Sequence, residues 1–105
     1  MTAHDGRVIE LRKGSATLFV DETLGARLAS LVVAGRQRLV TRTNDLLGWG
    51  CYPMVPWAGR VRNGAFSWNG DGIGLPRRLP PHAMHGTVLD RPWTIESASR
   101  TEVCL

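Results

Sequence analysis

The amino-acid sequence predicts an all-β fold built from antiparallel strands, and two observations carry this prediction. Short runs rich in β-branched and aromatic residues recur at close spacing, and turns that contain glycine separate them. No stretch of the 105 residues has a helical period long enough for a stable helix. Prolines gather between Gly50 and Arg91, so turns and extended loops must shape much of that segment.

Four strands are expected in the first part of the chain, after residues 1–6, which are expected to be a frayed end. Turn residues at Lys13-Gly14-Ser15 and Gly35-Arg36 separate strands over residues 8–12, 16–20, 26–33 and 37–42. Within the third strand, simple alternation predicts one face made of Ala26, Leu28, Ser30 and Val32. Asn44-Asp45 can cap one short helical turn within residues 43–49.

The second part of the chain combines loops with further strands. The prolines of residues 52–56 exclude that segment from the middle of a sheet, and residues 76–81 are expected to form an extended loop. Asn69-Gly70 predicts a hairpin that joins residues 66–68 to residues 73–75. Two more strands are expected over residues 93–98 and 101–105. Packing roles are assigned to Trp49, Trp68 and Trp93.

The last expected strand reaches Leu105 with no turn or cap after it. A sheet that stops there presents unpaired backbone donors and acceptors along an edge. The sequence therefore predicts an incomplete antiparallel β-sandwich with long proline-rich loops, which self-associates through its exposed strand edges.

Composition excludes several classes of function. The formal net charge is +4, but the 12 arginines are scattered without a nucleic-acid-binding motif, so no nucleic acid is expected as a partner. No apolar run is long enough to cross a membrane and the N-terminus lacks a signal peptide, so the expected location is cytoplasmic with no membrane partner. Cys51 and Cys104 are expected to be reduced thiols that pack as small apolar groups.

Three blocks of sequence resemble the first part of the aldose 1-epimerase (galactose mutarotase) family. They are YPMVPWAGRVRNGAF over residues 52–66, PPHAMHG over residues 80–86 and DRPW over residues 90–93. The resemblance implies the supersandwich fold of that family, with residues 1–105 as the N-terminal portion of a single domain. It also implies an isomerase that interconverts the α and β anomers of a free hexose by acid/base ring opening, without cofactor or metal.

The same resemblance assigns roles to three residues. His85 matches the first active-site histidine, which binds the sugar close to its ring oxygen, and Arg60 matches the arginine of an Asn-Arg pair that holds the sugar. Here Gly59 stands where the family has the asparagine. Trp57 is a candidate for stacking on the sugar ring. The ordinary alternatives are a loop histidine bonded to backbone, a surface ion pair for Arg60 and a packing role for Trp57.

The general acid and general base of the family, a second histidine and a glutamate, match no residue of this chain, so the chain alone is expected to be inactive. His82 and His85 have no third ligand nearby, which argues against a metal site. Two alternatives stay open. One is a hexose-6-phosphate mutarotase that uses Arg60, Arg62, Arg77 and Arg78, and the other is a non-catalytic carbohydrate-binding module.

Overall fold

The computed structural model describes residues 8–105, so the predicted frayed end lies outside the described residues. The chain divides into two compact units, which we describe separately. The sheet unit comprises Met1–Pro53 and Asp90–Leu105, and the hairpin unit comprises Met54–Leu89. Within the described part, every strand pair is antiparallel and no helix is long and apolar enough to cross a membrane. The predicted all-β, antiparallel fold class is confirmed.

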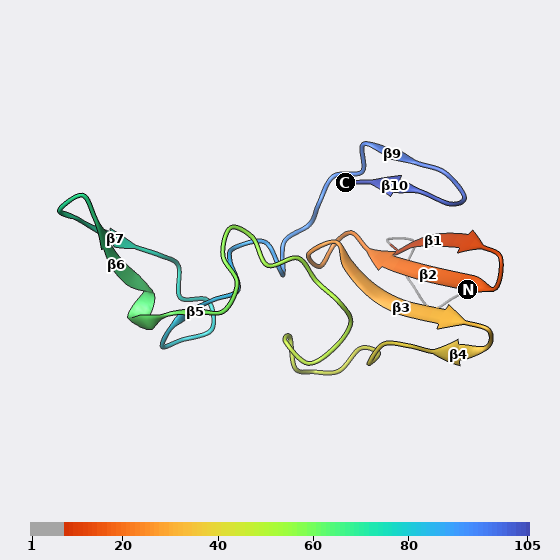
Figure 1. Ribbon diagram of the computed structural model, residues 1–105, viewed down its shortest axis with the longest axis horizontal. Helices are drawn as coiled ribbons and strands as arrows, with labels where there is room; N and C mark the ends of the chain where they lie inside the picture. Colours follow the sequence, from red (N-terminus) through yellow and green to blue (C-terminus); the bar gives the residue numbers. More distant parts are fainter. Residues whose placement is uncertain (1–7) are drawn as a thin grey trace. The chain divides into compact units, whose positions relative to one another are not determined.

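The sheet unit is built on a four-stranded sheet with the order β1-β2-β3-β4 (Figure 1). Its strands are β1 (Val8–Lys13), β2 (Ala16–Asp21), β3 (Arg27–Val33) and β4 (Arg36–Gln37). The first predicted hairpin and third strand are confirmed. The fourth strand is shorter than predicted, because residues 38–42 form no strand. The side-chain oxygen of Gln37 accepts hydrogen bonds from the Leu31 and Leu39 amides, so this side chain replaces the backbone acceptor that a longer strand would need.

A β-bulge changes the faces of β3. Phe19 pairs with Ser30 and Val20 pairs with Leu28, which leaves Ala29 as the extra residue. Because Phe19 and Val20 point to opposite faces, Ser30 and Leu28 do so too, and the predicted common face is wrong. Ala26 precedes the strand with a φ of 53°. The bulge gives the sheet one continuous apolar face, which we call the leucine face and which contains Ile9, Leu11, Ala16, Leu18, Val20, Leu28, Leu31 and Val33.

The opposite end of β3 carries a buried arginine that the sequence did not reveal. Arg27 is 0% exposed, and its guanidinium lies 4.4 Å from the ring centroids of both Trp49 and Tyr52. Its Nη1 donates to the carbonyls of Leu46 at 2.7 Å and Trp49 at 3.2 Å. Burial lowers the pKa of the guanidinium, whereas Tyr52 and Asp21 oppose that shift. Arg27 therefore holds the loop over residues 46–52 against β3.

Two expectations about this unit need correction. Residues 43–49 contain turns but no helix, since Asp45 Oδ1 accepts from the Leu47 amide and the Asp45 carbonyl accepts from the Gly48 amide. Both cysteines are free thiols, as expected, but both are exposed rather than packed. The C-terminal strands are confirmed in shortened form as β9 (Ser97–Ala98) and β10 (Val103–Cys104). The packing role of Trp49 is confirmed, since it is 3% exposed.

The hairpin unit contains two short ladders. In the first, β5 (Arg60–Val61) pairs with β8 (Ala83–Met84), and a 3-10 turn, η1 (Arg62–Gly64), follows β5. The second is the hairpin predicted around Asn69-Gly70, formed by β6 (Ala65–Trp68) and β7 (Asp71–Gly74).

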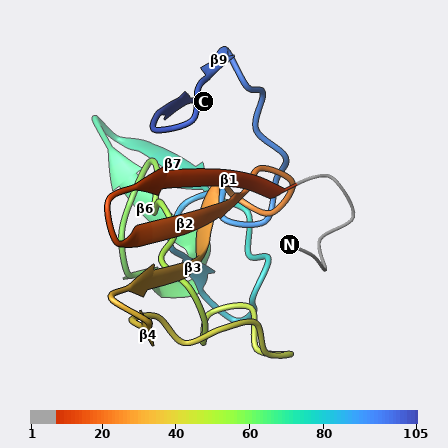
Figure 2. The same ribbon diagram turned by 90° about the vertical axis from the view of Figure 1, so that its right-hand side faces the viewer.

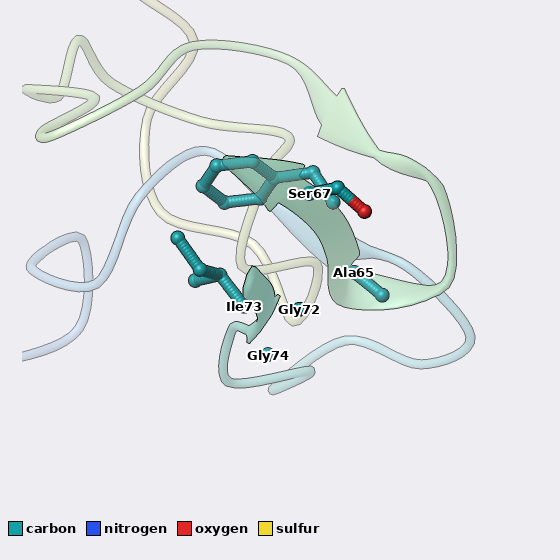
Figure 3. A pocket seen from close by; sticks show the side chains of 6 residues that line it. Ala65, Ser67, Gly72, Ile73 and Gly74 are labelled. Atoms are coloured by element: carbon teal, nitrogen blue, oxygen red, sulfur yellow. The ribbon is translucent and has the colours of Figure 1, made fainter. Parts of the chain in front are cut away.

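The two faces of the β6–β7 hairpin differ. Figure 3 shows Ile73 on one side and Ala65 and Ser67 on the other. The packing role predicted for Trp68 is wrong, because Trp68 is 66% exposed. Its strand is exposed along its whole length, so alternation provides no buried side for the indole.

Replacing Arg27 with methionine should lower the free energy of unfolding by about 2–4 kcal/mol, because two carbonyls lose their donor and two aromatic rings lose the cation. Urea unfolding followed by tryptophan fluorescence measures this loss. Arg38→Met is the matched control, since Arg38 is exposed and should change the free energy by less than about 0.5 kcal/mol. Equal losses for both variants would show that the Arg27 contacts do not stabilise the fold.

Candidate active site

The candidate site is organised by the β5–β8 ladder. Arg60 pairs with Met84 and Val61 pairs with Ala83. His82 and His85 immediately flank β8, just as Gly59 precedes β5. The ladder therefore brings the segment that contains Arg60 beside the segment that contains His85, although the two residues are far apart in sequence.

His85 is fixed by two hydrogen bonds with one residue. Its backbone amide donates to the Gly59 carbonyl at 2.8 Å, and its ring Nδ1 accepts from the Gly59 amide at 2.9 Å. An Nδ1 that accepts cannot carry a proton, so the neutral ring has its hydrogen on Nε2. His85 also has a φ of 54°, a left-handed conformation that costs a residue with a Cβ about 1 kcal/mol. Strain of this kind is typical of functional positions.

His82 makes the equivalent bond at the other end of the ladder. Its Nδ1 accepts from the Asn63 amide at 3.0 Å. Both histidines therefore satisfy backbone donors next to β5, which is the ordinary role that the sequence left open for a loop histidine. Within residues 8–105 no group of three His, Cys, Asp or Glu side chains is placed to hold a metal ion.

Gly86 has a different role from the one its sequence position suggests. A small neighbour beside His85 was expected to let a ligand approach closely. Instead, a Cβ at Gly86 would overlap the backbone of Val55, with which Gly86 forms a bridge, and the Thr87 amide donates to the Val55 carbonyl. The space that glycine provides here is filled by the chain itself.

Arg60 and Gly59 leave the other side of the site open. Arg60 is exposed and makes no ion pair with a described residue, so the surface ion pair considered as its ordinary role is not formed. Nothing lies within 4 Å of a Cβ built on Gly59. An asparagine side chain at this position would find open space beside Arg60.

Trp57 lines an apolar cavity of about 430 Å³ with Pro56, Val61, Phe66 and Leu75. Its Nε1 is buried and has no partner among the described residues. No polar side chain lines this cavity, whereas a sugar needs several polar contacts. The structure thus brings Arg60 and His85 to one ladder and places Trp57 in a separate apolar hollow of the same unit. Its stacking on a sugar ring stays a prediction.

Sequence reasoning missed the contacts that set the histidines. The Gly59 and Asn63 amides lie far from His85 and His82 in sequence, so no local pattern announces the bonds. The only available signal was the spacing of the histidines, which brackets Ala83 and Met84 and so fits a two-residue strand with a ring at each end.

A sequence model of the aldose 1-epimerase family matches residues 7–105. The chain belongs to the aldose 1-epimerase family. The match includes all three blocks that carry the resemblance, and with them Arg60 and His85. A comparison with curated protein sequences gave no significant match.

A solved structure gives the same result for the fold. The chain resembles the crystal structure of a protein from Escherichia coli K12 described as a candidate aldose 1-epimerase, with a TM-score of 0.76 and 25% sequence identity. The likeness covers 89% of this chain but only 33% of that one. The epimerase-like chain described here therefore spans about a third of the length of this homologue.

Gly86→Ala should destabilise the protein by about 2–5 kcal/mol, because the new Cβ adds a backbone clash to the cost of a left-handed alanine. Gly70→Ala is the matched control. Gly70 also has a positive φ, 84° against 76° for Gly86, but nothing lies within 4 Å of its Cβ, so about 1–2 kcal/mol is expected. Urea unfolding compares the two. A loss at Gly86 no larger than that at Gly70 would contradict the close approach of Val55.

Proposed function

We propose that this chain supplies the sugar-binding side of an aldose 1-epimerase, which holds a free hexose while its α and β anomers interchange. We further propose that residues 1–105 are the N-terminal portion of a single domain of this kind. The observation that carries the proposal is the fixed His85 ring, held by Gly59 beside the strand of Arg60 in a chain that belongs to the family.

Mutarotation requires only proton transfers. A base removes the proton of the anomeric hydroxyl while an acid protonates the ring oxygen, so the bond between that oxygen and the anomeric carbon breaks. The aldehyde carbonyl turns, and closure from its other face gives the other anomer. In this proposal His85 donates from Nε2–H to the sugar near its ring oxygen, and Arg60 holds hydroxyl groups with its fixed set of donors.

A ring that donates through a fixed nitrogen gains selectivity for an oxygen acceptor. Because Nδ1 is engaged by the Gly59 amide, rotation of the ring would cost that bond, so the Nε2–H direction is set before a ligand arrives. The two groups that transfer protons in the family resemblance match no residue here. The proposal therefore separates binding, which this chain performs, from proton transfer, which it lacks.

Polarimetry with freshly dissolved α-glucose or α-galactose tests the proposal. The chain alone should leave anomer exchange at the buffer rate, while NMR titration with galactose should show saturable shifts of the His85 ring resonances. His85→Ala should weaken binding at least about tenfold, because a charge-neutral donor to the sugar is lost. Gly59→Asn should strengthen binding, because asparagine tolerates the positive φ and fills the open space with an amide.

Arg100→Ala serves as the control, since Arg100 belongs to the sheet unit. Its binding should equal that of the unaltered chain. Exchange well above the buffer rate that disappears in His85→Ala would show that the chain is an active enzyme by itself. No saturable shifts with either sugar would refute the binding role, whereas binding without exchange is also the behaviour of a carbohydrate-binding module.

A hexose 6-phosphate is a second candidate ligand, and the charge of the hairpin unit favours it. Residues 54–89 contain four arginines, Arg60, Arg62, Arg77 and Arg78, against one acidic residue, Asp71. Arg78 Nη1 donates to the Thr87 carbonyl at 2.9 Å, which ties this guanidinium to the segment that follows His85. Arginines of this kind bind phosphate oxygens well.

If the phosphate reading is right, glucose 6-phosphate should bind at least about tenfold more tightly than glucose at low salt, and the difference should shrink as salt is added. Isothermal titration measures both. Arg77→Gln should remove most of the difference, whereas Arg36→Gln on β4 should leave it unchanged. Equal affinity for the two sugars, or no response to the phosphate, would eliminate this candidate.

A further inference from the structure

The leucine face of the β1–β4 sheet is apolar but largely uncovered. Of its eight members only Val20 is buried, at 2% exposed, and the other seven are partly exposed. The opposite face of the same strands is mixed, with Glu10, Thr17, Asp21, Arg27 and Ser30 among its side chains. An antiparallel sheet with this contrast normally packs its apolar face against a second layer.

The described residues hold too few buried side chains to be that second layer. Hydrophobic residues make up 43% of the sequence, yet the buried ones are Val20, Ala26, Trp49, Ala83 and Leu89. The match to the Escherichia coli structure extends over only 33% of that chain, so two-thirds of that protein has no counterpart here to cover a face of this kind. An apolar sheet face left in water costs about 25 cal/mol for each Å² of apolar surface.

The face is also hollowed. A cavity of about 210 Å³ opens on it, with Leu11, Leu18 and Leu31 from three adjacent strands and Ala16 among its lining. Figure 2 shows these strands, β1 to β3, side by side as neighbours in the sheet. Protein interiors are close-packed, so a facing layer would place an apolar side chain in this hollow.

We propose that a second copy of this chain covers the leucine face, so that two β1–β4 sheets pack face to face as an intermolecular β-sandwich. An interface with two-fold symmetry must be complementary to itself, and a face with an apolar centre and no acidic residue satisfies that condition. This surface is distinct from the strand edges at which the sequence predicted self-association.

The charges at the margin of the face fit this arrangement. Lys13 and Arg36 point to the same side as the leucine face, and both lie at the end of the sheet that holds the β1–β2 and β3–β4 turns. A two-fold axis that runs facing strands in opposite directions puts the cationic ends of the two copies apart. Parallel stacking would place four cations together, so the antiparallel arrangement is the one that avoids repulsion.

Light scattering after size-exclusion chromatography, over a wide range of concentration, tests the proposal on the full chain. The unaltered protein should form a dimer. Leu18→Lys places a cation at the centre of the face and should raise the dissociation constant about 100-fold or more. Thr17→Lys is the matched control, because it lies next along β2 on the opposite face and should change the constant less than about threefold.

A second pair, Leu31→Lys and Ser30→Lys on β3, repeats the comparison across the bulge, and circular dichroism confirms that each variant is folded. If Leu18→Lys is unfolded, the β3 pair decides. A monomer at every concentration would overturn the proposal, as would equal dispersal by both members of a pair. Polydisperse aggregates in place of a dimer would also overturn it, because they would show an apolar face without a defined partner.

Discussion

The reciprocal pair of hydrogen bonds between Gly59 and His85 is the contact on which the candidate site depends. It joins the turn before β5 to the residue after β8, so a ladder of only two residue pairs becomes a fixed corner. So short a ladder would be weak alone. The His82 bond to the Asn63 amide and the bridge from Val55 to Gly86 close the corner on its other sides. Imidazole rings here perform a structural role and present one nitrogen for chemistry.

The same economy is seen in the sheet unit, where a cation takes the place of an apolar residue. Arg27 lies between Trp49 and Tyr52 and donates to two loop carbonyls, so it satisfies acceptors that an aliphatic side chain would leave unpaired. Asp21 lies opposite Arg27 in the register and accepts from the Thr23 amide and hydroxyl. In each unit, polar side chains hold loops that contain too little apolar surface to hold themselves.

Local signals predicted the parts of the fold that depend on neighbouring residues. Lys13-Gly14-Ser15 and Asn69-Gly70 each specify a turn, and both hairpins formed where they indicated. The errors lie where a distant partner decides the outcome. The bulge at Ala29 depends on the pairing of β3 with β2, the early end of β4 depends on the Gln37 side chain, and the burial of Arg27 depends on two rings of another loop. For the candidate site, the sequence indicated His85 and Arg60 through the family blocks, but it held no signal for their backbone partner.

Gly59 shows why the loss of one side chain need not disable a site of this kind. Two properties of this position are in tension, since its φ of 78° suits glycine while its Cβ direction points into open space beside Arg60. Asparagine, which the family has here, is one of the few residues that tolerates that φ, and its amide would reach the space where a ligand hydroxyl would lie. Glycine keeps the backbone amide that holds His85 and gives up only the side-chain contact. The position therefore separates the orientation of the histidine, which backbone supplies, from the recognition of the ligand, which side chains supply.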